Sequence, residues 1–341
     1  MKEFLQRLFE GSSFEKGEMK AAVDLLLEDK TSESEVASFL TALKMKGETV
    51  KEISGLVELL RERADFQTFP AEDVMDICGT GGDGSQSFNI STTTAFVLAG
   101  AGVKIAKHGN RSVSSKTGSS DVLEHLGVAL DFNSGEINEM LEVNGLAFLY
   151  APHVHTRLKK IMKVRGELKV PTIFNMIGPL TNPINIDTQM LGIYRRDMLE
   201  TMASVLHELG RNRAVVLNGA GFMDEASLAG ENHLVLLDKG NTTSFTIKPE
   251  ETGLPVYSNE AIRGGDAREN AQILLDVLKG KEGPYLDTVI FNAGIALFAN
   301  GRTTTIAEGV KLARESIKSG AAYEKLQQTV TFSQRSRKKV M

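Results

Sequence analysis

The first 65 residues carry apolar positions at helical spacing and no run typical of a strand. Apolar side chains recur at helical intervals over residues 18–27, 36–46 and 50–63. The segment TSESE at 31–35 places hydroxyl and acidic residues before the second of these stretches, which favours a helix start there. We therefore predict four short amphipathic helices in a small helical domain, with apolar faces available for a subunit contact.

The pattern changes after residue 70, where short apolar runs alternate with helical segments. Strands are predicted at residues 74–78, 103–106, 146–150, 213–217 and 233–237. Helices are predicted at residues 91–101, from 119 to 126, and at 267–278, 288–298 and 304–317. This alternation indicates an α/β fold with a mainly parallel central sheet flanked by helices.

Two domains are expected, because the chain is longer than one typical domain. The helical domain should span residues 1–70, joined by about residues 164–185, and the large α/β domain should span 71–341. The closing segment SQRSRKKVM is basic, so we expect a frayed, solvated terminus. A ligand site between the two domains is a natural expectation.

The composition of the 341 residues narrows the class of protein. Cys78 is the single cysteine, which excludes an internal disulfide and fits a reducing compartment. The start MKEFLQRLFE mixes charged and apolar residues, unlike a signal peptide, and no uncharged run is long enough to cross a bilayer. The net charge of -5 argues against broad binding to nucleic acid or membranes. We expect a cytoplasmic protein.

Between Asp76 and Asp121 the chain has two loops rich in glycine and hydroxyl residues, joined by one apolar stretch. No acidic residue occurs from Gly84 to Ser120. The same window contains several basic or imidazole side chains, namely Lys104, Lys107, His108, Arg111 and Lys116. A lack of carboxylates among many small hydrogen-bond donors predicts a polyanionic ligand, bound largely by backbone N–H groups.

The first loop, GTGGDG at 79–84, formally matches the dinucleotide-binding fingerprint. That site also needs an acid about twenty residues further on, and none occurs before Asp121. A P-loop is excluded because no Gly-Lys-Ser/Thr follows. A tight turn without a ligand is the plain structural alternative. The donor-rich segments that follow favour an anion site at the next helix start, with Asp83 binding sugar hydroxyls or a metal.

The second loop begins at Lys107, directly after the second predicted strand. Open α/β sheets bind ligands outside the carboxyl ends of their strands. Further hydroxyl donors continue to the next helix, namely Ser114, Ser115, Thr117, Ser119 and Ser120. Both loops are therefore expected to face one crevice.

These loops and several later segments together resemble one enzyme family. The shared motifs are GTGGDG (79–84), FNIST (88–92), KHGNRSVSSKTGSSDVLE (107–124), FNMIGPLTNP (174–183), Asp224-Glu225 and FNAG (291–294). On these motifs the chain is similar to the anthranilate phosphoribosyltransferases of tryptophan biosynthesis, over nearly its whole length. This resemblance implies the fold that nucleoside phosphorylases and these phosphoribosyltransferases share.

The resemblance implies a reaction, a metal and an assembly. The phosphoribosyl group of 5-phosphoribosyl-1-diphosphate (PRPP) would pass to the amine of anthranilate through an oxocarbenium-like transition state. The products would be N-(5-phosphoribosyl)anthranilate and pyrophosphate, in the second step from chorismate to tryptophan. The resemblance also implies Mg²⁺, with two ions, and a homodimer formed through the N-terminal helices.

The resemblance further implies the site residues. The metal ligands would be Ser91, Asp224 and Glu225, which suits Mg²⁺ because it prefers oxygen ligands supplemented by substrate phosphates. Anthranilate would contact Gly79, Asn110, His155 and Arg165. No general acid or base is assigned, with His108 left open for that role. PRPP would contact Gly79, Gly82, Asp83, Ser87, Asn89, Ile90, Ser91, Thr92, Lys107, His108, Gly109, Asn110, Arg111, Ser112, Val113, Ser114, Ser115 and Ser119.

Two short segments depart from the family pattern. The family usually reads H-P-A-M-K where this chain has HTRLK at 155–159, and G-[IVF]-R-T where it has KVPT at 169–172. Thr156, Arg157, Lys169 and Pro171 therefore bear on anthranilate rather than PRPP. The H-x-H spacing of His153 and His155 does not predict zinc, since no Cys or carboxylate partner follows nearby.

Two other functions remain open at this point. A pyrimidine nucleoside phosphorylase-like enzyme would share the fold, but its second loop resembles K-x-S-G-R-G rather than KHGNRS. A non-catalytic nucleic-acid-binding relative would need a basic exposed face, which the acidic composition does not favour.

Overall fold

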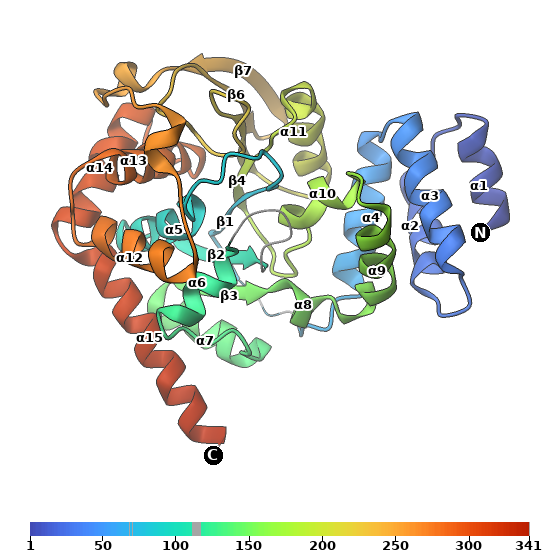
Figure 1. Ribbon diagram of the computed structural model, residues 1–341, viewed down its shortest axis with the longest axis horizontal. Helices are drawn as coiled ribbons and strands as arrows, with labels where there is room; N and C mark the ends of the chain where they lie inside the picture. Colours follow the sequence, from blue (N-terminus) through green and yellow to red (C-terminus); the bar gives the residue numbers. More distant parts are fainter. Residues whose placement is uncertain (68, 70, 111–116, 341) are drawn as a thin grey trace.

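The computed structural model describes residues 1–67, 69, 71–110 and 117–340. Its N-terminal part contains the four predicted helices, which lie at one end of the molecule (Figure 1). They are α1 (Lys2–Phe9), α2 (Lys16–Leu27), α3 (Glu33–Lys46) and α4 (Val50–Glu62). Capping boxes begin α3 at Ser32 and α4 at Thr49, where each hydroxyl accepts a hydrogen bond from a backbone N–H in the first turn. These local signals explain why the helices were predictable.

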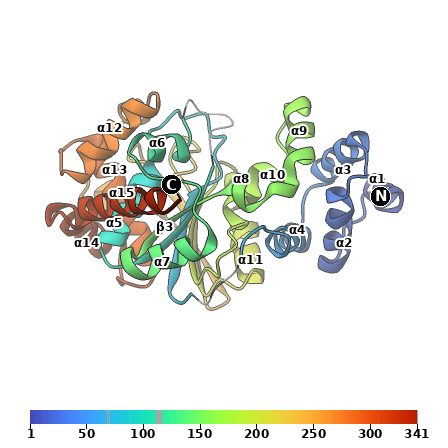
Figure 2. The ribbon, with the colours of Figure 1, turned by 90° about the horizontal axis from the view of Figure 1, so that it is seen from below.

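A later segment returns to this end of the molecule. Helices α9 (Lys159–Leu168) and α10 (Phe174–Ile177) lie beside the N-terminal helices in both views (Figures 1 and 2). Ile161 and Val164 of α9 are buried in the same hydrophobic cluster as Phe39 and Leu40 of α3. The chain between the third and fourth strands therefore supplies a wall of the helical part.

The sheet has seven strands in the order β3-β2-β1-β4-β5-β6-β7. The first five in this order pair in parallel and the last two pair antiparallel. The predicted α/β fold with a mainly parallel sheet is confirmed. The strands are β1 (Val74–Gly79), β2 (Lys104–Gly109), β3 (Leu146–Tyr150), β4 (Thr188–Gly192), β5 (Arg213–Asn218), β6 (Asn232–Asp238) and β7 (Asn241–Ile247).

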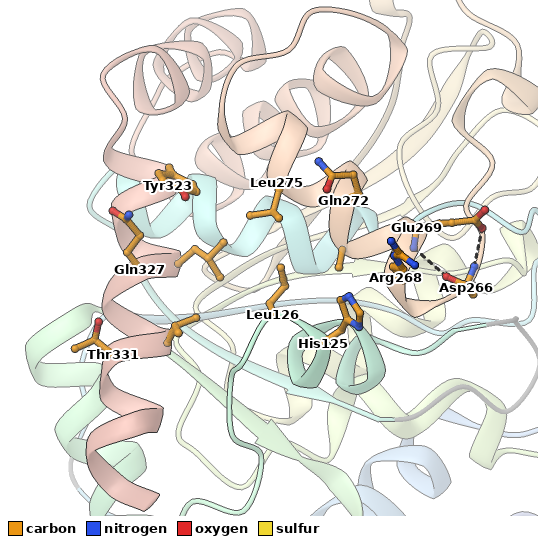
Figure 3. Close-up of a pocket in the computed structure, with 13 residues that line it drawn as sticks. His125, Leu126, Asp266, Arg268, Glu269, Gln272, Leu275, Tyr323, Gln327 and Thr331 are labelled. Carbon is orange, nitrogen blue, oxygen red and sulfur yellow. Dashed lines mark hydrogen bonds between the residues drawn. The ribbon is translucent and has the colours of Figure 1, made fainter. Parts of the chain in front are cut away.

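Helices cover both faces of the sheet. The remaining helices are α5 (Ile90–Gly100), α6 (Ser119–His125), α7 (Ser134–Asn144), α8 (Ala151–Val154), α11 (Leu199–Glu208), α12 (Ala267–Leu278), α13 (Pro284–Ala299), α14 (Ile306–Lys318) and α15 (Ala321–Val340). Residues of α6, α12 and α15 line a surface cavity of about 950 Å³ (Figure 3). These helices lie on the side of the sheet away from the helical domain (Figure 1).

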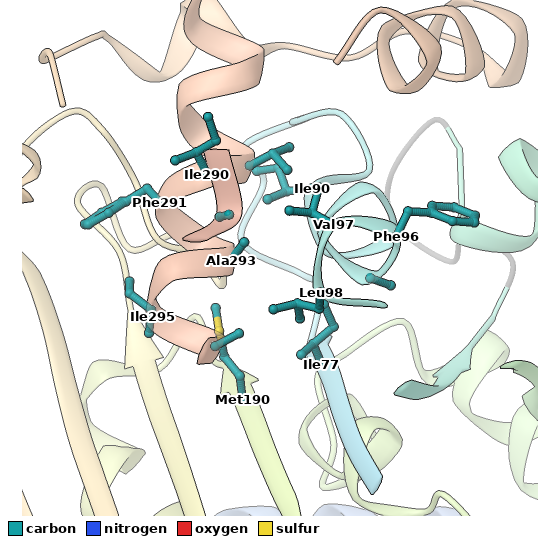
Figure 4. Packing of buried hydrophobic residues seen from close by; sticks show 14 of the residues in the cluster. Ile77, Ile90, Phe96, Val97, Leu98, Met190, Ile290, Phe291, Ala293 and Ile295 are labelled. Atoms are coloured by element: carbon teal, nitrogen blue, oxygen red, sulfur yellow. The ribbon is translucent and has the colours of Figure 1, made fainter. Parts of the chain in front are cut away.

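The largest core lies between the sheet and α5 and α13 (Figure 4). Ile77 and Met190 project from β1 and β4 toward Leu98 of α5 and Ile295 of α13. Both helices are buried on almost every side. Helix α5 is covered by α13, α14 and α15, and α13 lies between the sheet, α5 and α14. This packing holds the first turn of α5 rigidly at the carboxyl edge of the sheet.

The basic terminus differs from its prediction. Helix α15 continues to Val340, so the expected frayed segment is helical. The Ser333 hydroxyl accepts a hydrogen bond from the backbone N–H of Ala129, and Phe332 packs against Phe132 with ring centroids 5.7 Å apart. These contacts hold the helix as far as Ser333, whereas Gln334 and Arg335 beyond it are exposed to solvent.

Among the described residues, every helix is too short or too polar to span a bilayer.

Candidate functional site

A cleft of about 770 Å³ opens at the carboxyl ends of β1 and β2. One wall comes from the two loops and the other from α9, α10 and Leu60 of α4. Every described residue of the predicted site lines this cleft: Gly79, Gly82, Asp83, Ser87, Asn89, Ile90, Ser91, Thr92, Lys107, His108, Gly109, Asn110, Ser119, His155, Arg165, Asp224 and Glu225. The remaining predicted contacts, Arg111, Ser112, Val113, Ser114 and Ser115, lie outside the described residues.

The glycine loop after β1 adopts a backbone that only small residues accept readily. Gly81, Gly82 and Gly84 have φ angles of 69°, 81° and 72°. Asp83, between them, turns its carboxylate back to accept hydrogen bonds from the N–H and hydroxyl of Ser85, both at 3.0 Å. The loop therefore exposes backbone N–H groups beside the start of α5, as an anion site requires.

Asp224 and Glu225 are brought to this loop by the connection between β5 and β6. Asp224 accepts a hydrogen bond from Gly81 N at 2.6 Å, and its own N–H lies 3.4 Å from Asp83 Oδ2. Burial, together with the charges of Asp83 and Glu225, raises the pKa of Asp224 well above its ordinary value. Burial raises the pKa of Glu225 to about 7, although Lys107 and Ser91 act in the opposite direction.

This crowding of buried carboxyl groups fits a divalent cation. Two adjacent carboxylates and the Ser91 hydroxyl offer hard oxygen ligands, and a cation would relieve their mutual repulsion. Within the described parts of the chain, no three acid, histidine or cysteine side chains form a complete metal-binding group. Mg²⁺ would therefore complete its shell with water and phosphate oxygens, as it commonly does.

Lys107 lies at the floor of the cleft with 2% of its surface exposed. Its ammonium group donates hydrogen bonds to Ile77 O at 2.8 Å and to Ser91 Oγ at 3.0 Å. The alternation along β2 turns this side chain toward α5 rather than toward solvent. A buried ammonium between β1 and the start of α5 supplies fixed positive charge beside the acidic pair.

Two imidazoles form the next part of the cleft, with His108 and His155 rings 5.5 Å apart. His108 Nδ1 lies 3.3 Å from Gly178 O, and His155 Nε2 lies 2.9 Å from Thr181 O. A carbonyl accepts only, so each of these nitrogens carries the proton. Burial lowers the pKa of His108 to about 3 and also lowers the pKa of His155. Both rings are thus neutral near pH 7.

The second nitrogen of His108 has no hydrogen-bond partner in the part of the chain that the structure describes. His108 Nε2 is buried and makes no hydrogen bond with any described residue. Since Nδ1 is protonated, Nε2 carries a free lone pair in a side chain that lines the cleft. His153, by contrast, is exposed and packs against Tyr150, with ring centroids 4.9 Å apart.

Arg165 of α9 approaches from the helical wall. Its guanidinium lies 5.4 Å above the ring of Phe174 and donates to Asn175 Oδ1 at 3.3 Å. Asn175 Oδ1 also accepts from the backbone N–H of Thr172 at 2.9 Å, which fixes the amide orientation. Burial lowers the pKa of Arg165, but a guanidinium remains charged near neutral pH. One planar cation therefore faces the loops across the cleft.

The departures from the family pattern occupy different places. Thr156 lines the cleft, and its hydroxyl donates to Asp65. Lys169 ends α9 with a φ angle of 52°, and neither it nor Pro171 is among the residues lining the cleft. Arg157 is exposed. Of the four positions that depart from the family pattern, Thr156 is the one that lines the cleft and can contact a ligand there.

Several lining residues were not predicted as site residues. Phe174, Asn175, Gly178, Pro179 and Thr181 belong to the motif at 174–183, which was recognised as a family motif without a role. Its unusual run of Asn, Gly and Pro was the available signal. Asn270 does not line the cleft but contacts Asn89, and nothing in the sequence indicated this.

Family models match both parts of the chain. Residues 71–323 match the glycosyl transferase family, a/b domain, and residues 2–64 match the glycosyl transferase family, helical bundle domain. Together with the cleft at the sheet edge, these matches define a glycosyltransferase enzyme.

Individual relatives narrow the class. Anthranilate phosphoribosyltransferase of Exiguobacterium sibiricum is 61% identical over 327 residues, covering 96% of each chain. The crystal structure of anthranilate phosphoribosyltransferase from Thermus thermophilus matches with a TM-score of 0.92 and 39% identity, covering 97% of this chain and 99% of that one. The structure of anthranilate phosphoribosyltransferase from Saccharomyces cerevisiae in complex with PRPP and Mg matches with a TM-score of 0.89 and 26% identity. The match covers 98% of this chain and 97% of that one. The chain belongs to the anthranilate phosphoribosyltransferase family.

The family resemblance read from the sequence is thereby confirmed. These relatives support the transferase interpretation, and not the nucleoside phosphorylase or nucleic-acid-binding alternatives.

Proposed function

We propose that this protein transfers the phosphoribosyl group of PRPP to the amine of anthranilate, as the second step from chorismate to tryptophan. The observation that carries the proposal is one cleft with two chemically different walls. The glycine loop and Lys107, with a cation on the acidic pair, would suit a polyanion, whereas Arg165 would suit a carboxylate. The relatives named above support this substrate pair.

PRPP is proposed to bind along the loop wall. Its phosphates would accept from the N–H groups of the glycine loop and of the α5 start, Asn89 to Thr92. The second loop, including Arg111 to Ser115, is proposed to complete this contact. As the glycosidic bond breaks, negative charge grows on pyrophosphate and positive charge on the ribosyl carbon. Lys107 and the fixed N–H groups would stabilise the leaving group without reorganising.

Mg²⁺ is the proposed cofactor, with two ions and with Ser91, Asp224 and Glu225 as protein ligands. When bound, it supplies positive charge that stabilises the departing pyrophosphate. The burial of both carboxyl groups near Asp83 supports this assignment, since a cation would relieve the repulsion among these acids.

Anthranilate is proposed to bind between Arg165, Gly79, Asn110 and His155, with its carboxylate on the guanidinium. Its amine is already a neutral nucleophile, so positioning is the main requirement for attack. The nitrogen becomes a strongly acidic arylammonium when the N–C bond forms. His108 Nε2, with its free lone pair, is proposed to accept that proton.

The assembly and location are proposed as well. We infer a helical unit of residues 1–70 joined by 164–185, and an α/β unit of residues 71–341, with the cleft between them. Phe9 and Met45, 69% and 84% exposed on α1 and α3, support a homodimer through these helices. Light scattering should give twice the chain mass, and Met45→Glu should lower it; a monomer at all concentrations refutes the dimer. The proposed location is the cytoplasm.

Loss of anthranilate fluorescence tests the function. Wild-type protein with PRPP and Mg²⁺ should consume anthranilate, and omission of PRPP should stop the loss. A fluorescence signal that stays constant at high enzyme concentration contradicts the proposed reaction.

A further inference from the structure

Asn270, in the first turns of α12, is buried and hydrogen-bonded to a residue of the cleft. It is 3% exposed, and its Nδ2 donates to Asn89 Oδ1 at 2.9 Å. Its Oδ1 accepts from the backbone N–H of Gly265 at 2.8 Å. Asn89 occupies the N-cap position of α5, yet its side chain does not cap that helix. The Asn89 side chain is therefore held by α12.

These contacts fix which end of each amide faces which partner. The backbone N–H of Gly265 only donates, so Asn270 must present its oxygen there and its NH₂ group to Asn89. Asn89 must accept this hydrogen bond with its Oδ1 atom, so its Nδ2 group is the end of the amide that points elsewhere. Among the described residues Asn89 Nδ2 has no partner, and Asn89 lines the cleft. Asn89 thus offers N–H donors to a ligand.

The segment before α12 is held against both loops. Gly264 N donates to Gln86 O at 2.9 Å, and Thr117 Oγ1 donates to Gly265 O at 3.0 Å. A Cβ at Gly264 would lie 2.8 Å from Phe88 Cα, so only glycine permits this approach. The backbone N–H of Gly265, which orients the Asn270 amide, is therefore held in place by contacts with both loops.

The opposite side of α12 turns away from the cleft. Asp266 and Glu269 cap the start of the helix there through reciprocal hydrogen bonds of 3.0 and 2.9 Å (Figure 3). Gln272, on the same outer side, lines the surface cavity beside α15. Helix α12 thus carries a buried amide at Asn270 that contacts Asn89, and an exposed amide at Gln272 that can serve as a control.

We propose that Asn270 is a positioning residue that sets the direction of the Asn89 amide, so that Asn89 presents N–H groups to the phosphate or ribosyl oxygens of PRPP. Phosphate oxygens only accept, so a reversed amide would place oxygen against oxygen. This inference rests on the proposed function for the identity of PRPP. Asn270 itself lies outside the residues that line the cleft.

The nearly isosteric variant Asn270→Asp tests the direction. The variant keeps an acceptor for Gly265 N but loses the donor to Asn89. The Asn89 amide should then turn its NH₂ group toward residue 270 and its oxygen toward the cleft. The KM for PRPP should rise about tenfold or more, because a hydrogen bond is replaced by repulsion. The KM for anthranilate should stay within about twofold. Gln272→Glu makes the same chemical change on the outer side and should leave both constants unchanged.

A double-mutant cycle separates positioning from a structural role. In the Asn89→Ala background, Asn270→Asp should cause no further rise in the KM for PRPP. A rise that persists there, or an equal rise for both substrates, overturns the proposal. If Asn270→Asp does not fold, Asn270→Ala serves instead and should give a smaller rise that also vanishes in the Asn89→Ala background; a persistent rise again refutes it. Wild-type protein without activity refutes the proposed function, whereas active wild type with an unaffected Asn270→Asp variant refutes this inference alone.

Discussion

Asp224 accepts a 2.6 Å hydrogen bond from the backbone N–H of Gly81, across 143 residues of sequence. The acid is inserted so closely that a Cβ at Gly79 would lie 2.1 Å from its Oδ2, and one at Gly192 would lie 1.6 Å from its backbone O. Glycine at position 79 therefore makes room for the Asp224 carboxylate, and glycine at position 192 makes room for the Asp224 backbone. The glycine loop and the acidic pair form one unit.

This relationship gives a prediction for the acidic pair. Asp224→Asn combined with Glu225→Gln removes both negative charges while nearly preserving volume. Turnover should fall and the Mg²⁺ concentration needed for half-maximal activity should rise, because the hard anionic ligands are lost. A Mg²⁺ titration of the fluorescence assay measures both. An unchanged titration midpoint would show that these carboxylates do not hold the metal.

Lys107 should matter more for PRPP than for anthranilate. Lys107→Ala removes a buried ammonium that donates to Ile77 and Ser91 beside the start of α5. Loss of a charged hydrogen-bonding group should weaken PRPP binding roughly tenfold to a hundredfold. Calorimetry with each substrate measures the difference. Lys104→Ala, at the partly exposed start of the same strand, is the matched control, and equal weakening in both variants would argue against a specific role.

Arg165 should act on anthranilate alone. Arg165→Ala removes the cation of the helical wall and should raise the KM for anthranilate by roughly tenfold or more, with little change for PRPP. Arg165→Lys should recover part of the loss, because lysine keeps the charge but lacks the planar fork. Steady-state kinetics with each substrate varied in turn measures this. Lys163→Ala controls for charge on the same helix, and a parallel rise in both KM values removes the proposed role.

The fold was predictable wherever local chemistry decides structure. Helices α3 and α4 carry their own caps, β1 and β2 lead into polar loops, and β3 is a short apolar run directly before α8. Strand β4 was missed because Gln189 interrupts its apolar pattern. In the fold Gln189 is fully buried, donating to Pro179 O and accepting from Arg211. A polar residue satisfied by such distant partners gives no local signal.

The site divides in the same way. The loops after β1 and β2 were predictable as neighbours, since the carboxyl ends of parallel strands share one edge. The hydrogen bond between Asn89 and Asn270 joins residues 181 positions apart, and the orientation it fixes depends on Gly265. Only the folded chain brings these groups together. Likewise, the carbonyl of Gly178, 70 residues away, places the His108 proton on Nδ1 and so leaves the lone pair on Nε2.

Asp76 should give the protein a measurable pH dependence of stability. It is fully buried on β1, where it accepts from Asn182 Nδ2 at 3.0 Å and lies 3.4 Å from His108 N. Burial raises its pKa from 3.8 to about 6, even though Lys107 acts in the opposite direction. Between these values the folded state binds more protons than the unfolded state. The contribution of Asp76 to stability is therefore present below pH 3.8 and is lost as the pH rises through about 6.

Asp76→Asn removes this titration, so the difference in unfolding free energy between wild type and variant should change by about 2 kcal/mol from pH 4 to pH 7. The wild type should be favoured more strongly at the acidic end. Urea unfolding at several pH values measures the difference. Asp73→Asn, an exposed aspartate just before the same strand, should give a nearly constant difference. If Asp76→Asn also gives a constant difference, then Asp76 titrates alike in the folded and unfolded chains, and its burial does not raise its pKa.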